Sequence, residues 1–188
     1  AVSTSALEGT YALLSEVLEA DFLAEGELTS SVSEVRNYVT AAERAHEMVA
    51  SGQPISLRML ESLQSELLRG TPSDGPQAGS VRTTQVFIGV GRRHVSSARF
   101  VPPPPDHRLL DGLRQWQDWI REPSPVPTIV RVAVAHYQFE ALHPFHDGNG
   151  RLGRLVMVLQ LMAAGDLRYP VLNIAPWLEQ HRTEYQDG

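Results

Sequence analysis

The chain has 188 residues, 42% of them hydrophobic and 20% charged, a composition typical of one soluble globular domain. Its net charge of -6 argues against a nonspecific nucleic-acid binder, which needs a basic face, and no apolar run is long enough to span a bilayer. The absence of cysteine excludes disulfides and thiolate metal sites and favours a reducing cytoplasm. The chain begins at Ala1 without a signal-peptide pattern, so we expect a piece of a longer protein.

The N-terminal third is predicted to be helical. Residues 4–23, 31–51 and 56–70 place apolar side chains at helical spacing. Gly9 breaks the first segment or allows a close approach, Ser33 is a candidate N-cap of the second, and a glycine closes the third. A loop rich in glycine, proline and serine follows.

Residues 81–100 are the one segment with convincing β character. Residues alternate in polarity from Gln85 to Ile88, and Gly89 and Gly91 follow, which predicts a small hairpin. The four prolines that come next indicate a stiff connector rather than a ligand for an SH3-type domain.

The C-terminal half contains four further predicted helices, at residues 107–121, 127–142, 151–165 and 176–186. The two tryptophans of the first are expected as core or interface anchors. The second is apolar almost all round, which predicts a buried central helix. The predicted fold class is therefore mainly α, a helical bundle with one small β-hairpin.

The stretch HPFHDGNGRLGR, residues 143–154, places polar and conformationally loose residues between two apolar helices. Gly148 and Gly150 permit positive φ and leave peptide N–H groups uncovered, so that successive amides can form an anion-binding nest at a helix start. Arg151 and Arg154 are three residues apart and can present two planar forks to phosphate oxygens on one side. The stretch predicts a cradle for a polyphosphate.

Two further side chains beside this cradle are of the types that catalyse reactions at phosphate. Asp147 borders it, and a carboxylate beside phosphates usually shares a Mg²⁺ ion. His143 lies at its mouth, where an imidazole with a reference pKa of about 6.5 can accept a proton from a hydroxyl. Base, metal and cradle are the parts of nucleotide transfer. A zinc site made of His136, His143 and His146 is a less favoured alternative, because zinc would not explain the adjacent glycines and arginines.

At this point the sequence resembles a known family. HPFHDGNGRLGR matches the Fic-domain signature, His-x-Phe-x-(Asp/Glu)-Gly-Asn-Gly-Arg-x-x-Arg, at every fixed position. AHYQFEALHPF, residues 135–145, is similar to the helix that precedes the motif in the family. VRTTQVFIG, residues 81–89, and ARFVPPPP, residues 98–105, are similar to its flap region. The resemblance covers residues 3 to 186 and implies a mainly α-helical Fic fold.

The resemblance also implies an activity, the transfer of AMP from ATP to a Ser, Thr or Tyr hydroxyl of a protein, including the enzyme itself, with release of pyrophosphate. It implies His143 as general base and Asp147 as the Mg²⁺ ligand. The retained Gly-Asn-Gly favours adenylylation over the phosphorylation that Doc kinases perform. The nucleotide-binding positions that it implies are Ile88, Gly89, Gly148, Asn149, Gly150, Arg151, Leu152, Gly153, Arg154, Tyr185 and Gln186. Gln186 departs from the paired tyrosines that many relatives have near the adenine, so base recognition is less certain from the pattern.

The N-terminus resembles a regulatory element of the same family. TSALEG, residues 4–9, fits the inhibitory pattern (Ser/Thr)-x-x-x-Glu-(Gly/Asn). The resemblance implies that Glu8 pairs with Arg154 and keeps it from the γ-phosphate; an ordinary amphipathic helix is the alternative. We therefore expect an N-terminal helical segment at residues 1–30 that carries the inhibitory motif and a Fic core at residues 31–188, with further chain possible beyond it.

The hypothesis from sequence is an autoinhibited protein adenylyltransferase that uses ATP and Mg²⁺. The alternatives are a hydrolase that uses Glu8 to remove AMP from a modified protein, and a domain that senses ATP without catalysis. Transfer of UMP or phosphocholine also stays open. The expected partners are a protein with an accessible hydroxyl and a second copy of the chain, with no membrane and no nucleic acid bound by this segment.

Overall fold

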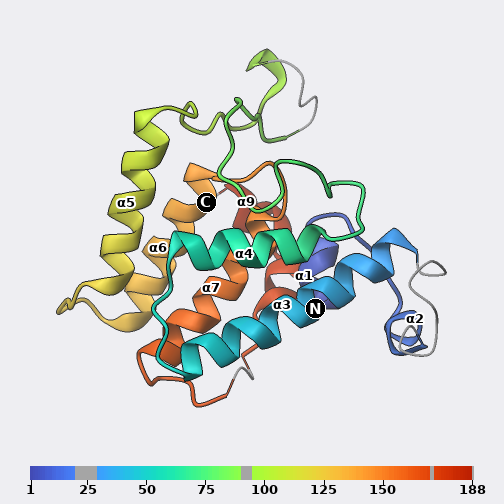
Figure 1. Cartoon of the computed structure of the whole chain (residues 1–188), viewed down its shortest axis with the longest axis horizontal. Helices are drawn as coiled ribbons and strands as arrows, with labels where there is room; N and C mark the ends of the chain where they lie inside the picture. Colours follow the sequence, from blue (N-terminus) through green and yellow to red (C-terminus); the bar gives the residue numbers. More distant parts are fainter. Residues whose placement is uncertain (20–28, 90–94, 170–171, 188) are drawn as a thin grey trace.

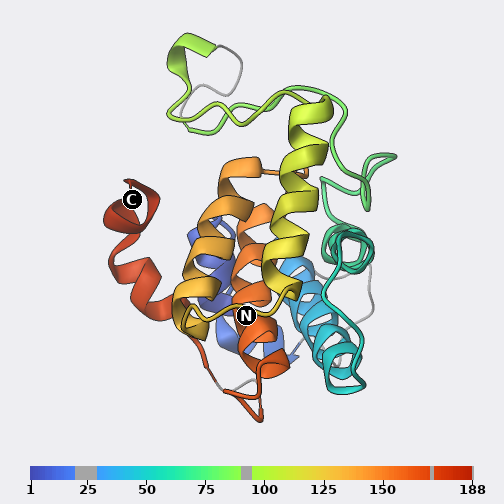
Figure 2. The same cartoon turned by 90° about the vertical axis from the view of Figure 1, so that its left-hand side faces the viewer.

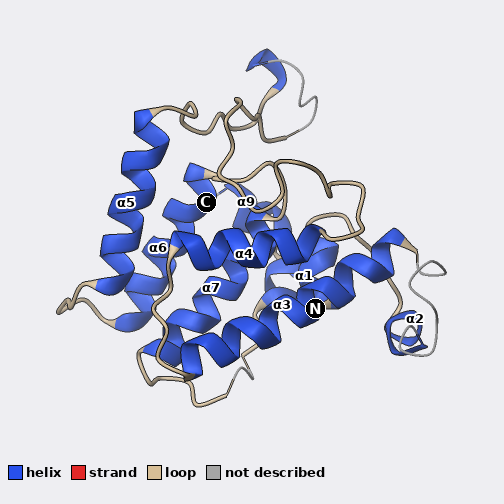
Figure 3. Cartoon of the chain, viewed as in Figure 1, coloured by secondary structure: helices blue, strands red, loops and turns tan. Residues whose placement is uncertain are grey.

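The computed structural model describes residues 1–19, 29–89, 95–169 and 172–187 (Figure 1). Helices and loops make up this part of the chain, and none of it is assigned to a strand (Figure 3). The elements are α1 (Val2–Leu7), α2 (Leu14–Glu19), α3 (Ser30–Ala50), α4 (Leu57–Leu68), the 3₁₀ turn η3 (Val95–Ser97), α5 (His107–Arg121), α6 (Thr128–Leu142), α7 (Asn149–Ala163), α8 (Ala175–Gln180) and α9 (Arg182–Asp187).

Helix α7 is the centre of the bundle. It packs against α6, α3, α4 and α1, while α5 packs against the far side of α6. In Figure 2, α5, α6 and α7 run side by side, with α3 and α4 on one flank and α8 and α9 on the other. Trp116 of α5 is fully buried, its ring lies 5.3 Å from that of Phe139, and its indole N–H donates to the Ala135 carbonyl at 2.9 Å. The predicted mainly α fold and the tryptophan anchor are confirmed.

The first two helical predictions need correction at their boundaries. Residues 4–23 do not form one helix: α1 ends at Leu7, Gly9 follows with φ 87°, and a separate α2 begins at Leu14. Residues 20–23 lie outside the described residues. Helix α3 begins earlier than expected because Thr29, rather than Ser33, is its N-cap, with its hydroxyl accepting from the Val32 N–H at 3.3 Å.

The predicted C-terminal helix is also divided. Helix α8 ends at Gln180, and His181 takes a non-helical backbone conformation before α9 begins. The His181 ring stacks on that of Trp177, with 4.2 Å between centroids, and the main-chain N–H of His181 donates to the Trp177 carbonyl at 3.1 Å. This stack holds the corner between the two short helices.

Helix α6 is only partly buried, so the prediction of a helix buried all round was wrong for one face. Ile129 and Tyr137 are 64% and 65% exposed, and Val130 and Val134 are exposed with them. The reason is that α5 and α7 cover α6 on two sides, and no described element covers the third. Neither α6 nor any other helix in the described ranges is long and apolar enough to cross a membrane.

The predicted hairpin is reduced to a single antiparallel bridge between Ile88 and Phe100. The Ile88 N–H donates to the Phe100 carbonyl at 3.0 Å, and the Phe100 N–H donates back at 3.2 Å. The ladder cannot extend past Val101 because the prolines that follow have no N–H to donate. Gly91, the second glycine of the predicted turn, lies outside the described residues.

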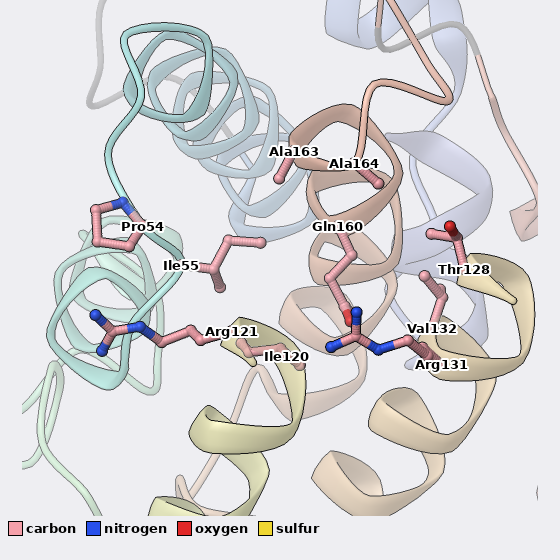
Figure 4. A pocket seen from close by; sticks show the side chains of 10 residues that line it. All are labelled: Pro54, Ile55, Ile120, Arg121, Thr128, Arg131, Val132, Gln160, Ala163 and Ala164. Atoms are coloured by element: carbon pink, nitrogen blue, oxygen red, sulfur yellow. The ribbon is translucent and has the colours of Figure 1, made fainter. Parts of the chain in front are cut away.

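A cavity of about 350 Å³ lies at the end of α6 and α7 that is remote from the 143–154 stretch (Figure 4). Ile55, Ile120 and Gln160 line it, together with Arg131 from the first turn of α6. The Arg131 guanidinium donates to two carbonyl groups near the end of α5, at 2.5 and 2.6 Å. This arginine therefore braces the α5–α6 connection.

Candidate active site

The 143–148 loop leaves α6 and enters α7 through two left-handed residues. His143 ends α6 with φ 47° and ψ 62°, and its N–H donates to the Phe139 carbonyl at 3.0 Å. It is the one non-glycine residue with positive φ in the described ranges, a conformation that sterics disfavour and that surrounding contacts must hold. Gly148, with φ 81°, is the N-cap of α7, and fully buried Phe145 anchors the loop between them.

Asn149 closes this loop. Its side-chain oxygen accepts from the Phe145 N–H at 2.9 Å, and its side-chain nitrogen donates to the Phe145 carbonyl at 2.8 Å, both in a buried setting. The carboxamide is therefore occupied by the shape of the loop. What Asn149 leaves for an anion is its main-chain N–H, which, like the next two amides of α7, has no acceptor within the helix.

Arg82 holds the loop from outside, and the sequence reasoning gave it no role. It is buried, its Nε donates to the His143 carbonyl at 2.8 Å, and its Nη2 donates to the carbonyls of Pro103 and Leu142 at 2.6 and 3.3 Å. Its main-chain N–H donates to the Pro144 carbonyl at 2.8 Å. Burial lowers the pKa of Arg82. One side chain thus ties the segment before the flap, the prolines after it and the end of α6 together.

Asp147 is held in place but remains accessible. Its Oδ2 accepts from the Ser73 hydroxyl at 2.6 Å and its Oδ1 from the Gly148 N–H at 2.6 Å, while Gln64 Nε2 donates to its carbonyl at 3.1 Å. The side chain is 46% exposed. Across the described part of the chain no group of three His, Cys, Asp or Glu residues could hold a metal alone. A single exposed carboxylate fits Mg²⁺, which takes its other ligands from phosphates and water.

The two motif arginines are buried, and each pairs with an acid from a distant helix. Arg151 is 2% exposed, and its Nη1 lies 3.0 Å from Oε2 of Glu34 in α3, with Asp147 at 3.5 Å from Nη2. Glu34 also accepts from the Thr10 hydroxyl at 2.8 Å. Glu34 was not predicted from the sequence, because no local spacing links α3 to the motif.

Arg154 is held by α1. Its Nη2 lies 2.7 Å from Oε1 of Glu8 and donates to the Thr4 carbonyl at 2.9 Å, and its Nε donates to the Thr4 hydroxyl at 2.6 Å. Burial by itself would lower the pKa of Arg154, but the charges of Glu8, Tyr185 and Glu140 and the hydrogen bond to Glu8 together raise it. The contact expected between the N-terminal pattern and the second motif arginine is present.

A cavity of about 330 Å³ collects the predicted site residues. It is lined by Glu8, by flap residues 85–89, and by His143 and the 146–150 segment. The predicted residues that it brings together are Glu8, Ile88, Gly89, His143, Asp147, Gly148, Asn149 and Gly150. One cavity is therefore bordered by the carboxylate of Glu8, the imidazole of His143, the carboxylate of Asp147 and the first residues of α7.

Other predicted positions lie elsewhere. The Leu152 side chain is fully buried in the main hydrophobic core, so it is a packing residue, which corrects its place in the predicted nucleotide set. Gly153 faces α6, where a Cβ would collide with Glu140. Tyr185 is partly buried and does not line the cavity. The side chain of Gln186 is outside the described part of the structure.

The alternative zinc site is not formed. His136 is buried and its Nε2 lies 2.8 Å from the Tyr185 hydroxyl, whereas His146 is exposed at the cavity and lies near Thr84. Burial lowers the pKa of His136 to about 4, with the charge of Arg154 acting in the same direction. His136 is therefore a neutral partner of Tyr185.

Comparison with known proteins assigns the family. Residues 54–161, more than half of the chain and including the whole motif loop, match the Fic/DOC family. The chain belongs to the Fic/DOC family. The crystal structure of a Fic family protein from Desulfovibrio desulfuricans G20 superposes on this Fic domain with a TM-score of 0.74 and 25% identity, covering 97% of this chain and 52% of that one.

Two curated relatives extend the comparison. Protein adenylyltransferase fic-1 of Caenorhabditis elegans is 38% identical over 95 residues, which are 50% of this chain and 17% of the relative. Protein adenylyltransferase Fic of Drosophila grimshawi is 29% identical over 178 residues, 94% of this chain and 33% of the relative. This Fic domain therefore spans a third or less of the length of these two relatives.

Proposed function

We propose that the chain is the catalytic domain of a protein adenylyltransferase that is inhibited by its own N-terminal segment. The observation that carries this proposal is the 2.7 Å ion pair between Glu8 and Arg154, beside a complete Fic motif. Residues 1–30 act as the regulatory segment and residues 31–188 as the catalytic core. The adenylyltransferase names of the curated relatives support the reaction class.

ATP binds with its phosphates against the start of α7. Residues 148–150 line the cavity, the amides of residues 149–151 have no acceptor within the helix, and the positive end of the helix favours an anion there. Arg151 and Arg154 supply guanidinium groups to the β- and γ-phosphates. Asp147 holds Mg²⁺, which, when bound, neutralises charge on the leaving phosphates.

The reaction moves AMP to a hydroxyl of a protein. The hydroxyl oxygen forms a bond to the α-phosphorus, the bond from that phosphorus to the bridging oxygen of the β-phosphate breaks, and pyrophosphate leaves. The hydroxyl proton goes to the imidazole of His143, which lies in the same cavity. Ile88 and Gly89 border this cavity from the flap. The backbone of Ile88 is already paired with Phe100, so an extended target segment would pair with the neighbouring flap residues that line the cavity.

Inhibition follows from competition for one guanidinium. Arg154 is buried and its Nη2 is taken by Glu8 and Thr4, so it cannot at the same time be directed at a γ-phosphate. Gly150 lies under the same carboxylate, since a Cβ at that position would collide with Glu8. The Glu8 carboxylate therefore does two things at the phosphate cradle: it fills space there and it neutralises the charge of Arg154. The protein target, a homodimer and a cytoplasmic location stay predictions.

The test is the transfer of label from ATP radiolabelled at the α-phosphate, with Mg²⁺, in three proteins. Glu8→Gly should label itself and added lysate proteins much more strongly than the wild type. Glu19→Gly, which removes an exposed glutamate of the neighbouring α2, should behave as the wild type. Adding His143→Ala to Glu8→Gly should lower labelling by about 10²–10⁴-fold, the usual contribution of a general base. Equal labelling by Glu8→Gly and the wild type would refute the proposal.

One observation favours a second candidate, removal of AMP. Glu8 lines the same cavity as His143 and Asp147, and its side chain is 37% exposed, so water can reach it. Water would attack the α-phosphorus and give its proton to Glu8, the bond from that phosphorus to the protein oxygen would break, and the imidazolium of His143 would give a proton to that oxygen. Wild type incubated with a target labelled by Glu8→Gly should release labelled AMP if this candidate holds, and Glu8→Gln should not.

A further inference from the structure

A half-buried glutamate, one oxygen of which is buried without a hydrogen-bond partner, lies near the inhibited arginine. Glu140 is in the last turn of α6, three residues before His143. Its Oε1 is buried and accepts no hydrogen bond in the structure. Gly153 of α7 leaves the room that Glu140 occupies, since a Cβ there would collide with Oε1. Such an orphaned carboxylate oxygen is costly to bury, which points to a partner that arrives in another state.

The groups that face Glu140 come from four helices. They are Glu8 of α1, His136 on its own helix α6, Arg154 of α7 and Tyr185 of α9. Burial raises the pKa of Glu140 to about 7, the charge of Arg154 opposes this rise, and the charge of Glu8 adds to it. Burial raises the pKa of Tyr185 to about 12. Since the pKa of His136 is lowered to about 4, both Tyr185 and His136 stay neutral near pH 7.

Two carboxyl groups therefore border one guanidinium from different directions. Glu8 reaches Arg154 directly from the end of a six-residue helix, at 2.7 Å. Glu140 interacts with the same guanidinium through its charge, from within the bundle, and makes no hydrogen bond to it while Glu8 is docked. If Glu8 leaves, the guanidinium loses its closest counter-charge, and the carboxylate already beside it is that of Glu140.

We propose that Glu140 is a positioning residue which takes over Arg154 when Glu8 withdraws, and that ionisation of Glu140 works against the docking of Glu8. The inference rests on the proposed autoinhibition. When Glu140 is protonated, there is no second negative charge next to Glu8, and Arg154 pairs with Glu8. Ionised Glu140 repels Glu8 and holds the guanidinium in the site, where an incoming phosphate meets it.

The sign of the pH dependence follows. The docked state binds a proton at Glu140 more tightly than the released state, because the charge of Glu8 is absent after release. Docking is therefore favoured below about pH 7 and weakened as the pH rises through that value. Inhibition should be strong on the acid side and should relax on the alkaline side.

The experiment measures the ratio of initial labelling rates, Glu8→Gly divided by wild type, at a series of pH values. Titration of His143 and of ATP affects both proteins and cancels in the ratio. The ratio should fall between about pH 6 and about pH 8, by at most about tenfold for each pH unit, the limit for one proton whose pKa drops on release. In a Glu140→Gln background, which cannot ionise, the ratio should keep its acid-side value at every pH.

A second readout does not depend on activity. Calorimetric titration of wild type with Mg²⁺ and ATP, in two buffers of different ionisation enthalpy, counts the protons released on binding. At about pH 6.5 the wild type should release up to about one proton more than Glu8→Gly, because binding displaces Glu8 and ionises Glu140. Glu140→Gln should lose this excess. If Glu140→Gln does not fold, an equal proton count for wild type and Glu8→Gly still overturns the proposal.

The outcomes separate the two proposals. No activation by Glu8→Gly overturns the proposed autoinhibition. Activation by Glu8→Gly with a ratio that is flat with pH overturns the role of Glu140 alone. A ratio that falls with pH equally in the Glu140→Gln background does the same, because another group would then carry the proton.

Discussion

Asn149 offers a direct test of how the motif loop keeps its shape. Its carboxamide makes both the donor and the acceptor bond to the backbone of Phe145, and all of these groups are buried. The change Asn149→Ala removes both bonds and leaves the Phe145 N–H and carbonyl without partners. We predict a large loss of stability in the absence of any nucleotide, because the asparagine side chain bonds the backbone of the loop and not a ligand.

The magnitude follows from the two unpaired groups. Each buried donor or acceptor that is left unsatisfied costs about 1–3 kcal/mol, so the free energy of unfolding should fall by about 2–6 kcal/mol. A domain of this size is stable by about 5–15 kcal/mol, so the loss is a large share of the total. With a shift of about 2–4 °C per kcal/mol, the Tm should drop by roughly 4–24 °C.

The measurement is thermal and urea unfolding of the apo protein, followed by circular dichroism. Asn173→Ala is the matched control, because Asn173 is exposed and accepts one bond from the Ala175 N–H at 3.3 Å. That change should cost about 0.5–1.5 kcal/mol, the net contribution of one ordinary hydrogen bond. An Asn149→Ala protein with unchanged stability but weakened ATP binding would refute the reasoning, since the side chain would then act on the ligand and not on the loop.

Further outcomes can be checked on the same protein. Arg82→Gln should lower the free energy of unfolding by about 1.5–3 kcal/mol, the loss of charge-assisted bonds to buried carbonyls, whereas exposed Arg108→Gln should leave it nearly unchanged in the same urea titration. Gly112→Ala should cost about 1–3 kcal/mol, because the new methyl group meets a leucine at the end of α6, whereas Gly75→Ala points into open space and should cost nothing measurable. Chelation with EDTA should abolish labelling by the de-repressed enzyme, and Asp147→Asn should raise the Mg²⁺ concentration needed to restore it; labelling that survives EDTA would contradict the assignment of a metal.

Local patterns predicted the parts of the fold that local forces determine. Helix α5 was predicted at residues 107–121 and is found there, because the prolines before it cannot join the helix and Asp106 caps its first turn. The motif loop was predicted from the order of its residues, since glycines, arginines and a histidine within twelve positions need no tertiary information. The break at Gly9 was also visible, although the helix that it ends is shorter than expected.

The misses concern contacts between distant parts of the chain. Arg82 bonds residues sixty positions away, and Ser73 bonds Asp147 across seventy-four. Glu34 and Arg151 are 117 positions apart. No period or cap marks such pairs in one sequence, because each partner on its own looks like an ordinary surface residue. The exposed face of α6 was missed for a related reason: apolar periodicity reports what a face could bury and not what lies against it.

The burial of both motif arginines explains why an acid has to be present in the empty enzyme. A guanidinium that is nearly fully removed from water is unfavourable without a counter-charge, and phosphate supplies one only after ATP binds. Arg151 receives its acid from α3, a 21-residue helix that packs along α4 and α7. Arg154 receives its acid from Glu8, at the C-cap of the six-residue α1. The two arginines therefore differ in how easily the counter-charge can be withdrawn, and the proposed regulation acts on the one whose acid is carried by the shorter helix.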